Sequence, residues 1–310
     1  LKPENWDELD VFAVFYGLDE DDDFRDESTW IKAQPSLNHV IPISNYRRML
    51  KEYTAQDALD NWERYQCCRY SLQGLQWIQL KEWRTANGPV ERPPLGTPIY
   101  ASIDFSKSFD LTSLAYGFWL EGKFHVNWHH WAIKDPHIEG VKRHYQRFVD
   151  NWDRYENVTI CNHQVQYDAV KEKLEELKTW GNLKRVGYDA LGGMKTSVQT
   201  WGDIDENYNP ETDLPMWSMP QTIMVMGPST YLAESFLRHR NLVISPDPVV
   251  EYALANVQLE KNINGDRRPC KLKSMGIIDP VVAMVMLFGV IIREGAERPG
   301  AYSDVADIAC

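Results

Sequence analysis

Residues 99–132 read IYASIDFSKSFDLTSLAYGFWLEGKFHVNWHHWA, and this stretch decides the fold class. Apolar and polar residues alternate from Ile99 to Phe105, and aromatic and β-branched residues are frequent from Leu111 to Leu120 and from Phe124 to Ala132. Glu121-Gly122 joins the last two runs and suits a tight hairpin turn. We therefore predict three consecutive antiparallel strands.

Strands and helices alternate through the rest of the chain. We expect helices at about 140–155, 163–180, 229–238, 249–255 and 280–292, and strands at 184–189, 222–226, 242–245 and 257–262. A β-meander followed by such alternation indicates a mixed α/β sheet with helices on its faces.

A segment rich in proline and glycine separates this pattern from the N-terminal part. It runs from Asn87 to Pro98 and contains four prolines before the first strand. The residues before it carry helical patterns rich in Trp, Tyr and Arg. We predict a mostly helical segment at 1–95 and an α/β domain at 96–310.

Composition restricts the class of protein. The chain has 310 residues, of which 43% are hydrophobic, so it can bury a sizeable core. A net charge of −12 argues against a protein that coats DNA through general positive charge. The five cysteines form no CxxC pair, and the longest apolar run, from Val281 to Ile292, is too short to span a bilayer.

Four aspartates are candidate ligands for a metal ion. Asp104 lies within the first predicted strand, and Asp110 follows six residues later. Asp189 ends a predicted strand, where ligands gather in open α/β sheets, and Asp279 precedes Pro280 at the start of an apolar helix. A buried carboxylate needs a partner for its charge, and a metal is one such partner. Each aspartate could instead cap a turn or a helix.

A predicted basic hairpin is the candidate DNA contact. Asn264-Gly265 is a strong turn signal, and basic residues flank it on both sides. Such a hairpin could lie along a phosphate backbone, although solvated surface charge is the plainer interpretation. The candidate DNA-binding residues are Lys261, Arg267, Arg268, Lys271 and Lys273.

Three segments, in order along the chain, resemble the terminase large subunit family of tailed phages, in its HK97-like branch. The first is residues 19–38, DEDDDFRDESTWIKAQPSLN, which is similar to the end of the ATPase region. The second is residues 103–112, IDFSKSFDLT, which is similar to the first nuclease motif. The third is residues 255–283, which is similar to the final nuclease motif.

The resemblance implies an RNase H-like fold for the second domain and endonuclease activity on concatemeric double-stranded DNA. Asp104, Asp189 and Asp279 would be the central metal ligands, and Asp110 a further acidic position. Two Mg²⁺ or Mn²⁺ ions would support hydrolysis of the phosphodiester bond. A cluster of acids filled by cations also reconciles a nuclease with the negative net charge.

The sequence departs from the family at the middle motif. Members of this branch often continue after the acid with Pro-Trp, whereas Ala190 and Leu191 follow Asp189 here. Asp203 and Asp205 are therefore kept as alternatives to Asp189.

The resemblance also implies partners and a place of action. These are double-stranded DNA, the portal protein and the small terminase subunit, in the host cytoplasm and transiently at the procapsid, with no membrane. We find no GxxxxGK[ST] loop, since Lys195 follows Met194 rather than glycine, so we expect no ATP hydrolysis by this chain alone. Complete family members carry that motor upstream.

Two other readings remain open. Another RNase H-like nuclease, such as a resolvase or a transposase core, would use the same carboxylates. A non-catalytic DNA-binding or docking module would use the aspartates only to cap helices and turns.

Overall fold

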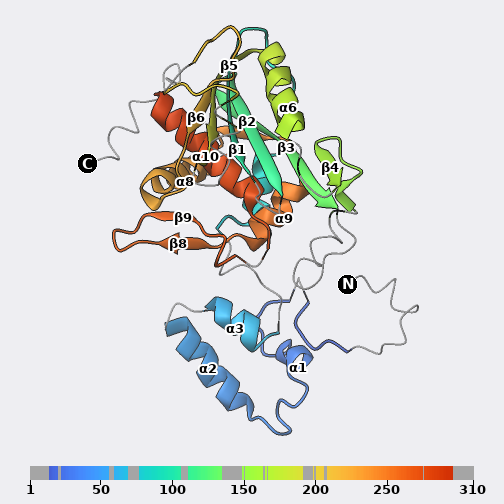
Figure 1. The fold of residues 1–310 in the computed structure, drawn as a ribbon. Helices are drawn as coiled ribbons and strands as arrows, with labels where there is room; N and C mark the ends of the chain where they lie inside the picture. Colours follow the sequence, from blue (N-terminus) through green and yellow to red (C-terminus); the bar gives the residue numbers. More distant parts are fainter. Residues whose placement is uncertain are drawn as a thin grey trace. The chain divides into compact units, whose positions relative to one another are not determined.

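The computed structural model describes residues 14–19, 22–55, 59–68, 77–105, 111–134, 149, 151–162, 165, 167–190, 198, 200–205, 208–274 and 276–295. The chain divides into two compact units, Leu1–Leu75 and Gln76–Cys310 (Figure 1).

The first unit is helical around a small aromatic core. Its helices are α1 (Trp30–Ala33), α2 (Ile43–Ala55) and α3 (Leu59–Tyr65). Trp62 is fully buried, and its ring centroid lies 5.5 Å from that of Trp30 and 5.4 Å from that of Tyr46. Burial of large aromatic rings is the main stabilising contribution available to so short a unit. The described part of this unit is thus helical, as predicted for the N-terminal segment.

The second unit begins before the predicted boundary at 95/96. Helix α4 (Leu80–Trp83) and the short helix η2 (Arg84–Ala86) belong to it. The ring of Trp83 lies 6.2 Å from that of Trp128, which is in the central sheet, and Gly88 donates a backbone hydrogen bond to the carbonyl of Ile244. The apolar partners of Trp83 thus lie in the second unit, which places this segment there.

A seven-stranded mixed sheet forms the centre of the second unit (Figure 1). Its strands are β1 (Pro98–Asp104), β2 (Thr112–Leu120), β3 (Lys123–Lys134), β4 (Val158–Asn162), β5 (Asn182–Tyr188), β6 (Met216–Ser218) and β7 (Leu242–Ile244). They lie in the order β4-β3-β2-β1-β5-β6, and β7 pairs with β3. Strand β2 is antiparallel to β1 and β3, whereas the other pairings are parallel.

The predicted antiparallel meander β1-β2-β3 is confirmed. Glu121 and Gly122 form the tight turn between β2 and β3 with φ of 51° and 77°. Glycine adopts this left-handed conformation without steric cost, which explains its place at the second position of the turn.

One predicted strand is wrong. Residues 223–226 belong to helix α8 (Ile223–Arg238), which has Thr222 as its N-cap and continues through Pro228. The run Thr-Ile-Met-Val resembles a strand locally, and a proline such as Pro228 disfavours the interior of a helix. Burial of Met226 and of the following turns in the core stabilises the helix despite both signals.

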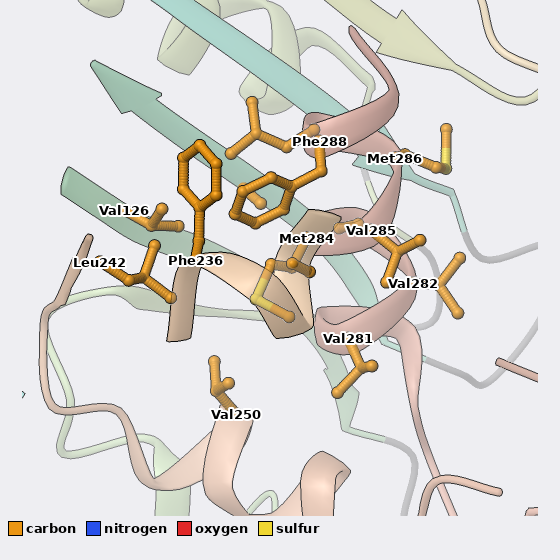
Figure 2. Close-up of a cluster of buried hydrophobic side chains, with 14 of the residues drawn as sticks. Val126, Phe236, Leu242, Val250, Val281, Val282, Met284, Val285, Met286 and Phe288 are labelled. Atoms are coloured by element: carbon orange, nitrogen blue, oxygen red, sulfur yellow. The ribbon is translucent and has the colours of Figure 1, made fainter. Parts of the chain in front are cut away.

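Helix α10 (Asp279–Glu294) is the central element on one face of the sheet. Val281 to Ile291 are buried without a polar stripe, as expected for a helix that is covered on all sides. Figure 2 shows Phe288 of α10 beside Phe236 of α8, and the same cluster includes Val250 of α9 (Pro248–Asn256) and Val126 of β3. Among the described residues, no helix is long and apolar enough to cross a membrane.

Helix α6 (Tyr167–Trp180) covers the opposite face. Its buried residues Val170, Leu174 and Leu177 belong to the same apolar cluster as Ile103 of β1. The second unit is therefore a sheet between two helical layers, and α10 is the helix that can bring its N-terminus to the carboxyl end of β1.

A separate two-stranded hairpin precedes α10. Its strands are β8 (Leu259–Lys261) and β9 (Arg267–Pro269), and Gly265 adopts a φ of 89° in the connecting turn. Figure 1 shows the hairpin beside α8. The predicted Asn-Gly hairpin is confirmed.

Candidate active site

Asp104 is a buried carboxylate at the carboxyl end of β1. Side chains of β1 alternate between the faces of the sheet: Ile103 joins the α6 core, whereas Ser102 donates a hydrogen bond of 2.5 Å to the carbonyl of Ala283 in α10. Asp104 therefore projects on the α10 face, and only 3% of the residue is exposed. Its charge must be compensated inside the protein.

Asp279 is the first residue of α10 and is also 3% exposed. Pro280 follows it, and the fixed φ of proline suits the first turn of a helix. The positive end of the helix dipole favours a carboxylate at this position. Because α10 packs across β1, its start lies near Asp104.

Lys271 joins the two carboxylates. Its Nζ lies 2.8 Å from Oδ2 of Asp104 and 2.7 Å from Oδ1 of Asp279. Burial alone lowers the pKa of Lys271, but the charges of Asp104 and Asp279 raise it by more, so the pKa lies well above its ordinary value. The ammonium is thus a firmly held cation between two buried anions.

The exposure of these three side chains is unequal. The side chains of Asp104 and Asp279 are 4% and 5% exposed, whereas that of Lys271 is 46% exposed. The acids are fixed in the core, and the lysine reaches them from the solvent side. Lys271 was predicted to contact DNA. Its position between the two acids has no local sequence signal, because it depends on how the hairpin and α10 pack.

Gln221 completes the surroundings of Asp104 and was missed by sequence analysis. Its Nε2 donates a hydrogen bond of 2.9 Å to Oδ1 of Asp104. The guanidinium of Arg268 donates to the backbone carbonyl of Gln221 and pairs with Glu260. The end of the hairpin is therefore linked to the carboxylate site through Gln221. A glutamine in a loop carries no local pattern that would identify it.

Asp189 follows β5 directly at the same edge of the sheet. In the parallel pair of β1 and β5, Ile103 lies opposite Tyr188, so Asp189 comes next to Asp104 in the register. Asp189 is partly buried and directly follows Tyr188, the last residue of β5, whose side chain belongs to the α6 core. The topology thus brings the middle acid to the edge where the first one lies.

The remaining predicted acids differ in what the structure shows of them. Asp110 lies outside the described residues. The carboxylate of Asp203 accepts a hydrogen bond of 3.0 Å from the backbone N–H of Asp205. Asp205 forms an ion pair of 3.5 Å with Arg293. Asp203 and Asp205 therefore each have a local partner.

Three of the five predicted DNA-binding residues pair with acids of the protein. Arg267 lies 2.8 Å from Glu234, Arg268 pairs with Glu260, and Lys271 bridges the two buried aspartates. The other two, Lys261 and Lys273, are exposed.

The chemistry of the site fits a hard divalent cation. Asp104 and Asp279 offer only carboxylate oxygens, the ligands that Mg²⁺ and Mn²⁺ prefer. The space between them already accommodates a positive charge, that of Lys271. In the described part of the chain, no group of three or more His, Cys, Asp or Glu side chains is gathered as a metal site.

Comparison with known proteins gives a consistent result. A family model for the terminase large subunit, endonuclease domain, matches residues 6–294. The large terminase subunit of Enterobacteria phage HK97 is 24% identical over 304 residues, which cover 95% of this chain and 57% of that protein. Protein YmfN of Escherichia coli (strain K12) is 21% identical over 305 residues, which cover 90% of this chain and 63% of that protein.

The fold has a counterpart among solved structures. The crystal structure of the HK97 bacteriophage large terminase matches with a TM-score of 0.59 and 21% identity, over 93% of this chain and 59% of that one. This likeness confirms the predicted RNase H-like sheet flanked by helices. The chain spans less than two thirds of the length of each of these relatives.

Proposed function

The chain belongs to the terminase large subunit family, in the part described as the endonuclease domain, and we propose that it is a metal-dependent endonuclease that cuts double-stranded DNA. One observation carries the proposal: two buried carboxylates, Asp104 and Asp279, meet around a cation at the carboxyl end of a central strand. Aspartates that only cap a turn or a helix would not be expected to share the ammonium of one lysine, as these two share that of Lys271.

Asp104 and Asp279 would be the central metal ligands, with Asp189 as the third. Asp110 would be a weaker contributor to a second metal position. When bound, two Mg²⁺ or Mn²⁺ ions would lower the pKa of the attacking water and stabilise the leaving oxygen of the phosphodiester.

The protein's own contribution is to fix the carboxylates. Gln221 holds Oδ1 of Asp104 in one orientation through its hydrogen bond. Helix α10, buried along most of its length, holds Asp279 at a fixed position relative to β1. Such outer contacts determine how well ligands are aligned before a metal or a phosphate arrives.

We propose the hairpin side of the site as the surface that contacts DNA. Lys261 and Lys273 are exposed there and are suited to phosphate oxygens. Arg267, Arg268 and Lys271 were predicted to contribute as well, although each also pairs with an acid within the protein.

Concatemeric viral DNA would be the substrate, and the portal protein and small terminase subunit the partners. The host cytoplasm, and transiently the procapsid, would be the place of action. These assignments rest on family membership. A resolvase or transposase-type activity would instead show a preference for branched DNA or strand transfer.

The test is digestion of supercoiled and linear plasmid with Mn²⁺, Mg²⁺ or EDTA. We expect metal-dependent cutting by the unchanged chain and a loss of more than about 100-fold in Asp104→Ala and Asp279→Ala, because even outer-shell changes cost 10–100-fold at metal sites. The matched control is Asp168→Ala, an exposed acid in the first turn of α6 on the opposite face. Cutting retained in both site variants would contradict the proposal.

Metal binding separates an enzyme from a docking module. Titration with Mn²⁺ should show binding that Asp104→Ala abolishes and Asp168→Ala preserves. If Asp104→Ala left Mn²⁺ affinity unchanged, Asp104 would be a structural residue and the docking interpretation would be favoured.

A further inference from the structure

We propose that Lys271 is a built-in counter-cation of the carboxylate site, which a divalent metal must displace in order to bind. The inference rests on the proposed function, because it assigns a role to Lys271 at the same site. It goes beyond that function in making the metal compete with a residue of the chain itself.

Geometry is the first argument for competition. The Nζ of Lys271 is within 2.8 Å of Asp104 and 2.7 Å of Asp279, so it lies in the space where an ion shared by the two carboxylates would be. An ammonium and a divalent ion cannot occupy that space together. Displacement also changes the charge of the group: two carboxylates with one lysine carry −1, and without the lysine they carry −2. A divalent ion binds the more negative group more strongly.

Exposure is the second argument, because it shows which partner can leave. The two acids are almost fully buried and belong to a strand and a helix of the core, whereas 46% of the Lys271 side chain is exposed. A hollow of about 200 Å³ lies beside it and is lined in part by Gln221, Glu260 and Leu272. The ammonium can therefore move into solvent without disturbing the core.

The hairpin has an anchor that does not depend on Lys271. Arg268 donates to the backbone carbonyl of Gln221, and Gln221 in turn donates to Asp104. When Lys271 leaves, these contacts keep the end of the hairpin beside the site. Displacement therefore involves a side chain and not the folding of the hairpin.

The experiment is a Mn²⁺ titration of the full chain, followed by the EPR signal of free Mn²⁺, with melting temperatures measured in EDTA and in Mn²⁺. Lys271→Met removes the charge and keeps an unbranched apolar side chain. Lys271→Gln also removes the charge but keeps a hydrogen-bond donor for the carboxylates, in case the methionine variant does not fold in EDTA. Lys123→Met is the matched control, since it removes the same charge from an exposed lysine at the start of β3 that has no role in the proposed site.

We expect both Lys271 variants to bind Mn²⁺ about tenfold more tightly than the unchanged chain. A factor of ten in affinity has the same free energy as a shift of one pKa unit. Their melting temperatures should be lower in EDTA and should rise more on addition of Mn²⁺, because binding stabilises the folded state. Lys123→Met should behave like the unchanged chain. Equal or weaker Mn²⁺ binding by the Lys271 variants would overturn the proposal. Absence of Mn²⁺ binding in every form would overturn the proposed function as well.

Discussion

The charges of buried aspartates are compensated in two different ways in this protein. Asp247 accepts hydrogen bonds from Asn157 and from the backbone N–H groups of Val249 and Val250, and it pairs with the buried His130 at 2.9 Å. Burial raises the pKa of Asp247, but His130 and these hydrogen bonds lower it by more. Asp247 is therefore fully engaged in capping α9. Asp104, by contrast, shares the half-exposed ammonium of Lys271 with Asp279 and accepts one hydrogen bond from Gln221.

His129 should make stability depend on pH. Burial, then the charges of Lys173 and His130, lower the pKa of His129 to about 3 from an ordinary value of 6.5. Between these two values the unfolded chain binds one more proton, so the free energy of unfolding falls as pH decreases below 6.5. The slope from this one residue is at most about 1.4 kcal/mol per pH unit. Denaturant unfolding at pH 7, 6 and 5 should show a shallower dependence in His129→Gln.

The control for this pH effect is His239→Gln, since His239 is exposed at the end of α8. It should retain the pH dependence of the unchanged chain. An identical slope in His129→Gln and in the unchanged chain would mean that the pKa of His129 does not differ between the folded and the unfolded protein.

The two central acids could be predicted from the sequence, but the residues that surround them could not. Asp104 and Asp279 stand at positions with a local signature, one in an apolar strand and one before Pro280 at the start of an apolar helix. Lys271 and Gln221 have no such signature, because their contacts with the acids arise from packing between segments far apart in the sequence. The assignment of Asp189 as a ligand, and that of Asp110, remain predictions.

Among the elements, α10 makes the site possible because it lies very close to the sheet. A Cβ atom at Gly187 of β5 would be only 2.6 Å from Cγ2 of Val290 in α10 and 3.0 Å from Cγ of Met219. Glycine at this position allows the helix to approach the strand. The same helix begins with Asp279, so the packing of α10 on the sheet also sets the distance between Asp104 and Asp279.

Gly187→Ala should therefore affect both stability and the site. We expect it to lower the free energy of unfolding by about 1–3 kcal/mol through overpacking. It should also weaken Mn²⁺ binding, because a displaced α10 moves Asp279. Denaturant unfolding and Mn²⁺ titration would measure the two effects. Adding Val290→Ala should restore part of both, since it removes the clashing methyl groups, and wild-type stability in Gly187→Ala would refute the close packing.

Element prediction succeeded where the local pattern and the tertiary fold agree. The alternating strands β1 to β3 and the apolar helix α10 have long, strong patterns. Strands β4 and β6 are short and were not predicted, since five or three residues give little periodicity. The mistaken strand at 222–226 shows the opposite case, in which β-forming residues enter a helix because its face is buried.

At the scale of the whole chain, the two units have separate apolar cores. The cluster around Trp62 contains only residues of Leu1–Leu75, and the clusters around α10 and α6 contain only residues of Gln76–Cys310. All residues proposed for catalysis lie in the second unit. The structure therefore predicts that damage to the first core leaves the carboxylate site intact.

Trp62→Ala tests this independence in the full chain. Removing this buried ring should lower the free energy of unfolding by about 3–5 kcal/mol, because its contacts with Trp30, Tyr46 and Tyr53 are lost and a cavity is left. Hydrogen exchange should accelerate in α1 to α3, while exchange in β1 to β3 and the affinity for Mn²⁺ stay unchanged. Phe288→Ala, which removes a buried ring of α10 from the core of the second unit, should give the reverse pattern. If Trp62→Ala altered Mn²⁺ affinity, the first unit would have to contribute to the order of the site, and the two cores would not be independent.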